Sequence, residues 1–202
     1  MKCPECHMSY VEDSSDDRRL HRTYHDEIVN GIPACQLKSD ETIWRQGEDR
    51  IIVVDAFSPK SQRARAAKVG TAANQEVGYD GGVYSEHERP DDREIHLFLY
   101  ISGNRAVGLS ILEKRSCICH YTWEEYDRRE QKELEEKKPI WSLGFAWVHK
   151  KHRRRGIAKI LLLEAPRYLG VRIHDVGVYT PLSEDGEAFV RSIFREGFLI
   201  AK

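Results

Sequence analysis

The stretch WVHKKHRRRGIAKILLLE, residues 147–164, is the most informative part of this chain. It predicts a strand that ends at Trp147-Val148, then a basic turn, then an apolar helix that begins near Gly156. The first turn of a helix has unpaired N–H groups and the positive end of the helix dipole, so it can bind phosphate groups. Gly156 would let the backbone approach a pyrophosphate closely. We therefore interpret the turn as a phosphate-binding loop; the alternatives are a solvated basic turn and a nuclear-targeting patch.

The segments around this stretch predict alternating strands and helices. Strands are expected at 51–54, at 96–112 as two strands around a Gly103-Asn104 turn, and at 141–148, 172–180 and 197–201. Helices are expected at 59–77, at 184–194 and at 156–169, where Pro166 should bend or shorten the helix. Residues 78–92 are expected to form a loop, and the charge-dense stretch 123–138 a helix or a mobile insert. This order indicates a mixed α/β domain.

The first 30 residues look like a separate unit that is rich in metal ligands. Cys3 and Cys6 form a Cys-x2-Cys pair, and His21 and His25 lie four apart, which places both on one face of a helix. Two thiolates and two imidazoles are a common ligand set for a tetrahedral structural zinc ion. A unit this small has little core, so the metal would supply its folding free energy. The sequence therefore predicts a Cys2His2 zinc finger at 1–32, a connector at 33–48 and a larger domain at 49–202.

The charges of this finger favour a structural role over the reading of DNA. Three arginines, Arg18, Arg19 and Arg22, are outnumbered by the acidic residues Glu12, Asp13, Asp16, Asp17, Asp26 and Glu27. Acidic flanks oppose contact with phosphates. The formal net charge of the 202 residues is −1, which does not indicate a globally basic nucleic-acid binder. Direct DNA binding is therefore not expected.

The composition is that of a globular protein. Hydrophobic residues make up 40% of the chain and charged residues 32%, enough for a core and a well-solvated surface. No stretch approaches the ~20 apolar residues of a membrane span, and Cys3, Pro4 and Glu5 stand where a signal peptide would carry an apolar run. The cysteines number five, an odd count that does not suggest a disulfide framework. We expect an intracellular, reducing location with no membrane partner.

Together, the two motifs resemble one family, the cohesin acetyltransferases that establish sister-chromatid cohesion. The pattern Arg153-x-x-Gly156-x-Ala158 is similar to the acetyl-CoA loop of the GNAT superfamily, and CPECHMSY with LHRTYHDEIVNGI is similar to the finger of the family. RIIVVD (50–55) and FLYISGNRAVG (98–108) follow in the same order. The resemblance implies an α/β (α+β) fold, with a GNAT-type mixed central sheet and flanking helices after a small ββα zinc finger.

The resemblance also implies a set of site residues. Cys3, Cys6, His21 and His25 take the positions of the ligands to a structural Zn2+ ion. The pyrophosphate of acetyl-CoA would bind to the loop Arg153, Arg154, Arg155, Gly156, Ile157, Ala158 and Lys159. Trp147 and Val148 would form the strand whose backbone meets the pantetheine arm, and the N–H of Val148 would polarise the thioester carbonyl.

At two positions the chain departs from the family pattern. The serine that the family has near the substrate lysine corresponds to Gly144, and the aspartate that acts on the incoming amine corresponds to Thr180. Asp185 and Glu184 are the nearest acids in the expected substrate loop, so they join Thr180 as candidates for the catalytic group. Asp185 also fits an ordinary helix cap.

The implied function is acetyl-CoA-dependent N-acetylation of a lysine in a protein substrate, of the cohesin type by resemblance. A chromatin-associated partner is implied in the same way, with a nuclear location in a eukaryote and a cytoplasmic one otherwise. Two other classes of function stay open. Gly144 and Thr180 would suit a catalytically silent CoA-binding scaffold, and the finger would suit a nucleic-acid-binding protein.

Overall fold

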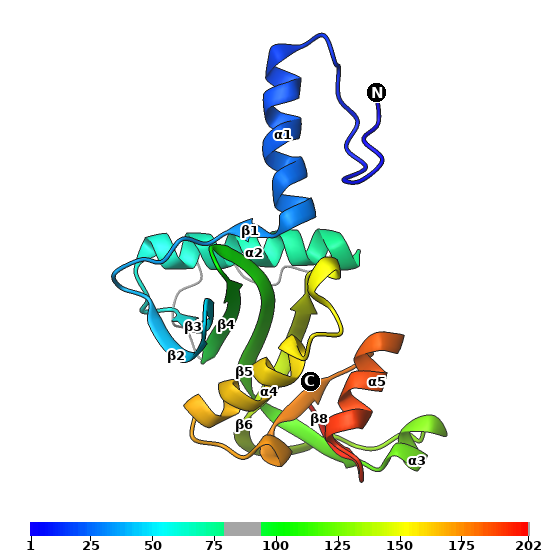
Figure 1. Cartoon of the computed structure of the whole chain (residues 1–202). Helices are drawn as coiled ribbons and strands as arrows, with labels where there is room; N and C mark the ends of the chain where they lie inside the picture. The colour runs from blue at the N-terminus through cyan, green and yellow to red at the C-terminus, as the bar shows by residue number, and fades with distance from the viewer. Residues whose placement is uncertain (79–93, 202) are drawn as a thin grey trace.

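The computed structural model describes residues 1–78 and 94–201 as one sheet with helices on both faces and a long N-terminal helix that stands away from the sheet (Figure 1). The strand order is β2-β3-β4-β5-β6-β7-β8, and β1 and β8 also pair with β5. The β6–β7 and β7–β8 pairings are parallel, and the others are antiparallel. The predicted loop 78–92 lies, from residue 79 on, outside the described residues.

The strands are β1 (Ile32–Pro33), β2 (Glu41–Gln46), β3 (Asp49–Asp55), β4 (Ile95–Ser102), β5 (Arg105–Tyr121), β6 (Glu135–Val148), β7 (Gly177–Tyr179) and β8 (Phe198–Ala201). The α-helices are α1 (Ser15–Asn30), α2 (Lys60–Val77), α3 (Trp123–Asp127), α4 (Ile157–Tyr168) and α5 (Glu184–Ile193). Short 3-10 turns lie at Lys150–His152 and Ile173–Asp175. None of the helices in the described part of the chain is long and apolar enough to cross a lipid bilayer.

The sheet is buried on both faces, which explains the continuous apolar run in β3. Ile51 and Val53 belong to the core under α4 and α5, whereas Ile52 and Val54 belong to the core under α2. Alternate side chains of a strand point to opposite faces, so a strand covered on both sides needs apolar residues at every position. This arrangement confirms the predicted mixed α/β fold.

Helix α4 packs closely on β5 because β5 has a glycine at the contact. A Cβ at Gly108 would lie 2.9 Å from Ile157 Cγ2 and 3.2 Å from Leu161 Cδ1. The glycine therefore lets the first turns of α4 approach the strand, with Ile157 and Leu161 buried against the sheet. This contact fixes where α4 begins, directly after the basic turn.

Helix α1 is attached to the domain by its C-terminal end. Its last turn contains no basic residue, and side chains from the domain contact this end instead. His149 Nε2 lies 2.8 Å from the carbonyl oxygen of Ile28, and Lys68 Nζ lies 2.5 Å from Glu27 Oε1. Arg105 forms an ion pair with Asp26 at 2.7 Å. Cations and donors at a helix C-terminus interact favourably with its free carbonyls and its dipole.

The prediction of a helix or a mobile insert over 123–138 is confirmed as helix at the start of the stretch and is wrong at its end, which forms a strand. A capping box of Thr122 and Glu125 starts α3, but the helix ends at Asp127. Strand β6 begins at Glu135 and pairs with β5, with Glu136 opposite Cys117. Residues 135–139 are exposed, so this end of the hairpin lacks the apolar alternation that marks a strand in the sequence.

Three smaller differences concern the bounds of elements. Strand β5 continues to Tyr121, beyond the predicted end of its hairpin at residue 112. The stretch 172–180 forms a 3-10 turn followed by the three-residue strand β7. The segment 33–48, expected to be a connector, contains β2. Helix α4 was predicted well and ends two residues after Pro166.

Candidate active site and metal centre

The four predicted metal ligands come together beside the middle of α1, which carries His21 and His25. One ligand atom from each of Cys3, Cys6, His21 and His25 lies within 4.8 Å of the other three. The cysteines belong to the turn before α1, which a bridge between Lys2 and Ser9 holds in place, and the histidines lie one helical turn apart on α1. Both cysteines are at least 94% buried.

The surroundings of these side chains fit a zinc ion. His21 Nε2 is buried and has no hydrogen-bond partner among the described residues, as expected of a nitrogen that faces a metal. His25 places Nδ1 3.3 Å from Cys3 Sγ and Nε2 3.3 Å from a carboxylate oxygen of Glu5. A carboxylate on the second ring nitrogen is a common support for a metal-bound histidine. The backbone N–H of Cys6 lowers the pKa of Cys3 to about 6, which favours the thiolate that zinc binds.

The basic turn lies between β6 and α4, as predicted. Gly156 has a φ of +81° at the N-terminus of α4, and a Cβ there would meet no atom within 4 Å. The space in front of the helix N-terminus is therefore open. Arg154 and Arg155 are exposed, whereas Arg153 forms an ion pair with Glu76 of α2 at 2.8 Å. Glu76 also accepts from the backbone N–H of Lys150, so it holds the turn against α2.

Strand β6 separates from β7 immediately before the turn. The two strands pair only at Ser142 with Gly177 and at Leu143 with Val178. On its other edge β6 stays paired with β5 as far as Val148. Leu143 and Phe145 of β6 oppose the consecutive residues Leu112 and Ile111 of β5, so Gly144 is the extra residue of a β-bulge. The bulge stands where the strands diverge.

The open edge of β6 offers a backbone N–H near the start of α4. The N–H of His149 donates to the carbonyl of Val107 in β5 at 2.9 Å. Backbone groups alternate in direction along an antiparallel strand, so the N–H and C=O of Val148 point to the opposite edge, which has left β7. Arg153 Nε donates to that C=O at 3.0 Å, in agreement with this direction.

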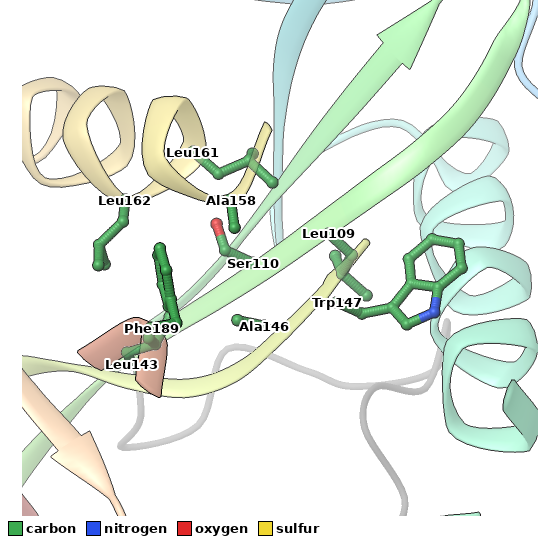
Figure 2. Close-up of a pocket in the computed structure, with 9 residues that line it drawn as sticks. All are labelled: Leu109, Ser110, Leu143, Ala146, Trp147, Ala158, Leu161, Leu162 and Phe189. Carbon is green, nitrogen blue, oxygen red and sulfur yellow. The ribbon is translucent and has the colours of Figure 1, made fainter. Parts of the chain in front are cut away.

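A small pocket lies between α4 and the β5–β6 pair (Figure 2). Its cavity volume is only about 10 Å3, about the space of one water molecule. Its lining is apolar except for Ser110, whose Oγ is buried and has no hydrogen-bond partner among the described residues. Figure 2 shows this hydroxyl directed toward Ala158 in the first turn of α4, whereas Trp147 points to the opposite face of the sheet. The Trp147 side chain belongs to the core under α2, so it does not face the first turn of α4.

The predicted catalytic candidates lie around the start of α5. Thr180 follows the last residue of β7 and is half-buried. Glu184 and Asp185 are exposed in the first turn of α5, where Ser183 Oγ accepts from the N–H of Gly186. Acidic residues in a first turn stabilise the helix dipole, so both carboxylates have a structural explanation.

The sequence analysis missed Glu113 of β5, which lies beside the bulge. Glu113 is 9% exposed and forms an ion pair with Arg115 at 2.9 Å. A Cβ at Gly144 would lie 3.2 Å from Glu113 Oε1 and 3.6 Å from the ring of Tyr179. One feature of the sequence could have identified Glu113: it directly follows the apolar run 106–112 of β5. A carboxylate next to a buried apolar run is unusual, because charged side chains are seldom buried without a partner.

Comparison with known proteins agrees with both parts of the chain. A family profile described as the zinc-finger of acetyl-transferase ESCO matches residues 1–27. The N-acetyltransferase ECO1 of Candida glabrata is 25% identical over 190 residues, covering 80% of this chain and 70% of that protein. The N-acetyltransferase ESCO2 of Danio rerio is 22% identical over 174 residues, covering 79% of this chain and 28% of that protein.

The fold is also that of a solved acetyltransferase domain. The structure of the xEco2 acetyltransferase domain bound to a K105-CoA conjugate superposes with a TM-score of 0.64 at 18% identity, covering 82% of this chain and 98% of that one. The finger match, the ECO1 and ESCO2 relatives and this shared fold lead to one conclusion. The chain is similar to the N-acetyltransferases ECO1 and ESCO2: residues 1–27 match the zinc-finger of acetyl-transferase ESCO, and the fold is that of the xEco2 acetyltransferase domain.

Proposed function

We propose that this chain transfers the acetyl group of acetyl-CoA to a lysine side chain of a protein substrate. The observation that carries the proposal is the divergence of β6 from β7 after Leu143, directly before the basic turn and the N-terminus of α4. A gap between strands can take an extended pantetheine arm through backbone hydrogen bonds. The adjoining helix N-terminus can take the pyrophosphate.

Residues 153–159 are proposed to bind the pyrophosphate. The N–H groups in the first turn of α4 and the exposed guanidinium groups of Arg154 and Arg155 supply donors and positive charge. Arg153 has a second role, because its contacts with Glu76 and with the carbonyl of Val148 hold the loop in position.

The N–H of Val148 is proposed to polarise the thioester carbonyl. It points to the open edge of β6, where negative charge develops on the carbonyl oxygen when an amine attacks. Acetyl-CoA supplies the reactive acyl group, and the chain supplies position, a donor for the oxygen and a route for the amine proton. Ser110 stands in the pocket beside this edge with a free hydroxyl donor.

The finger is proposed to bind one structural zinc ion through Cys3, Cys6, His21 and His25. A closed set of four ligands leaves no position for a reacting molecule, so the ion holds the N-terminal turn on α1 and takes no part in acetyl transfer. Arg18 donates to the backbone carbonyl of Glu12 and Arg19 pairs with Asp16, and the acidic residues around these arginines favour a protein partner over DNA. A chromatin-associated substrate of the cohesin type, and with it a nuclear location, is proposed from the relatives.

Calorimetric titration of the zinc-loaded chain with acetyl-CoA tests the cofactor site. Gly156→Tyr should abolish saturable binding, because the new side chain fills the open space before α4. Gly170→Tyr is a matched control, since Gly170 follows the same helix with a φ of +70° and also has nothing within 4 Å of a Cβ. Equal binding by both variants, or no binding by the unmodified chain, would contradict the proposed site.

A further inference from the structure

We propose that Glu113 binds the acceptor amine and takes its proton. This inference rests on the proposed acetyl transfer and adds the acceptor site to it. Glu113 stands beside the bulge at Gly144, the first residue of β6 after the last pairing with β7. It is therefore close to the end of the gap in which the acetyl group would be presented.

Position 144 carries no side chain on the face where the carboxylate lies. Glu113 Oε1 and the ring of Tyr179 lie 3.2 Å and 3.6 Å from the point that a Cβ at Gly144 would occupy. A primary amine that enters over the glycine would meet a carboxylate on one side and a phenol ring on the other. Carboxylates and aromatic rings both attract an ammonium group.

A cluster of neighbours holds the carboxylate in place. Arg115 pairs with Glu113 through Nη2, donates through Nε to the hydroxyl of Tyr179, and lies over the Tyr179 ring with 5.2 Å between Cζ and the ring centroid. The ion pair uses Oε1, and no hydrogen bond to Oε2 is found in the described part of the chain. Oε2 is thus available to an incoming ligand.

The burial of this group favours a role in the reaction. Ion pairs inside a protein gain little stability because both charges lose their hydration. The side chain of Glu113 is buried, with 9% of its surface exposed. Glu184 and Asp185, the acids expected from the sequence, are exposed in the first turn of α5. Among these three carboxylates, only Glu113 touches the volume beside the bulge.

The proposed step balances as follows. The acceptor ammonium gives one proton to Glu113, and the neutral nitrogen attacks the carbonyl carbon of the thioester. The new C–N bond forms, the C–S bond breaks, and the sulfur leaves as a thiolate that takes the second proton of the nitrogen. Glu113 then releases its proton to solvent. The products are an acetylated amine, CoA thiol and one proton.

The test compares Glu113→Gln with the unmodified zinc-loaded chain. Acetyl transfer from acetyl-CoA to poly-L-lysine is followed by release of the CoA thiol between pH 7 and 10, and acetyl-CoA binding is measured separately by calorimetry. At pH 7 the variant should be slower by about 100-fold or more with unchanged acetyl-CoA affinity. The difference should narrow toward pH 10, because lysine with a pKa of about 10.4 then loses its proton to solvent.

Two further variants separate a catalytic from a structural role. Glu113→Asp keeps the charge on a shorter side chain, so it should fold and recover part of the lost rate. Glu94→Gln removes an exposed carboxylate that pairs with Lys114 on the neighbouring strand, and its rate should match the unmodified chain. A loss of rate in Glu113→Gln that is equal at every pH would indicate a structural role and overturn the inference.

The outcomes also distinguish this inference from the proposed function. If the unmodified chain acetylates poly-L-lysine and Glu113→Gln does so equally fast, the acceptor site is wrong and the acetyltransferase stands. If the unmodified chain neither binds acetyl-CoA nor transfers acetyl groups, the proposed function fails, and the role of Glu113 fails with it.

Discussion

At the scale of single residues, Gly144 and Glu113 share one small volume beside β7. The glycine puts no side chain into this volume, and the carboxylate lies 3.2 Å from the position of the absent Cβ. A methyl group at that distance is tighter than normal contact with an oxygen, so the carboxylate would have to move. The bulge at position 144 therefore bears directly on the geometry of the acceptor site.

Gly144→Ala should lower the rate of acetyl transfer about tenfold with little change in acetyl-CoA affinity. The reason is that small displacements of a catalytic group are costly for the rate. Steady-state kinetics together with calorimetry would measure both quantities. In a Glu113→Gln background the same substitution should have little further effect; an additive loss would show that Gly144 acts independently of the carboxylate.

Residue spacing predicted the metal ligands but not the acceptor site. His21 and His25 lie four apart on a helix and Cys3 and Cys6 three apart on a turn, so local geometry alone brings each pair to one point. Glu113, Gly144 and Tyr179 come from three strands that meet only through sheet register. Register depends on long-range packing, which spacing in one sequence does not contain.

At the scale of elements, the joint between α1 and the domain depends on His149. This residue is 2% exposed and lies between Val148 and the basic turn, while its ring contacts the carbonyl of Ile28 in α1. His149 therefore connects the C-terminal end of α1 with β6, the strand proposed to meet acetyl-CoA.

His149→Ala should lower the free energy of unfolding by about 2 kcal/mol, because a buried ring is removed and the partly buried carbonyl of Ile28 loses its partner. Urea denaturation would measure this change, and limited proteolysis should show faster cleavage near Gly31. His174→Ala is the control, since His174 is exposed and should leave both measurements almost unchanged. Equal free energies of unfolding for the two variants would show that the contact between His149 and Ile28 does not hold α1 to the domain.

Elements were predictable where burial imposed a pattern. The runs in β3, β4 and α4 are apolar because the sheet and helices cover them, and each was predicted near its actual bounds. The first four residues of β6 are charged and exposed, and only their pairing with β5 makes this part a strand. A charge-dense hairpin end and a charge-dense helix therefore look alike in sequence.

At the scale of the whole molecule, the finger and the sheet have separate sources of stability. The two buried cores of the sheet contain residues from Ile32 onward, whereas residues 1–31 have few buried side chains of their own. The overall fold class was predictable because the strand and helix patterns alternate along the chain. The gap between β6 and β7 was not predictable from the sequence. It exists because the two strands pair at only two positions, and nothing in the sequence marks where that pairing ends.

Removal of zinc with a chelator should unfold the N-terminal turn and expose α1 to proteases while the sheet keeps its thermal transition. Circular dichroism should lose helical signal in proportion to the 16 residues of α1. Cys6→Ser should reproduce this state, whereas Cys35→Ser, at an exposed cysteine outside the cluster, should retain zinc. Loss of the whole fold on chelation would contradict the separation.

Helix α1 is held at its C-terminal end, so its N-terminal end can act as a lever arm. With 16 residues at ~1.5 Å per residue, the helix reaches about 24 Å from this pivot to Ser15, and the cluster at His21 and His25 lies at about half that distance or less. A swing of about 10° at the pivot would sweep the tip through about 4 Å while moving His149 very little. A protein that binds the N-terminal end of α1 would thus turn the helix about its C-terminal end. The large displacement at the bound end would become a small displacement at His149, the residue that follows Val148 in the strand proposed to meet acetyl-CoA.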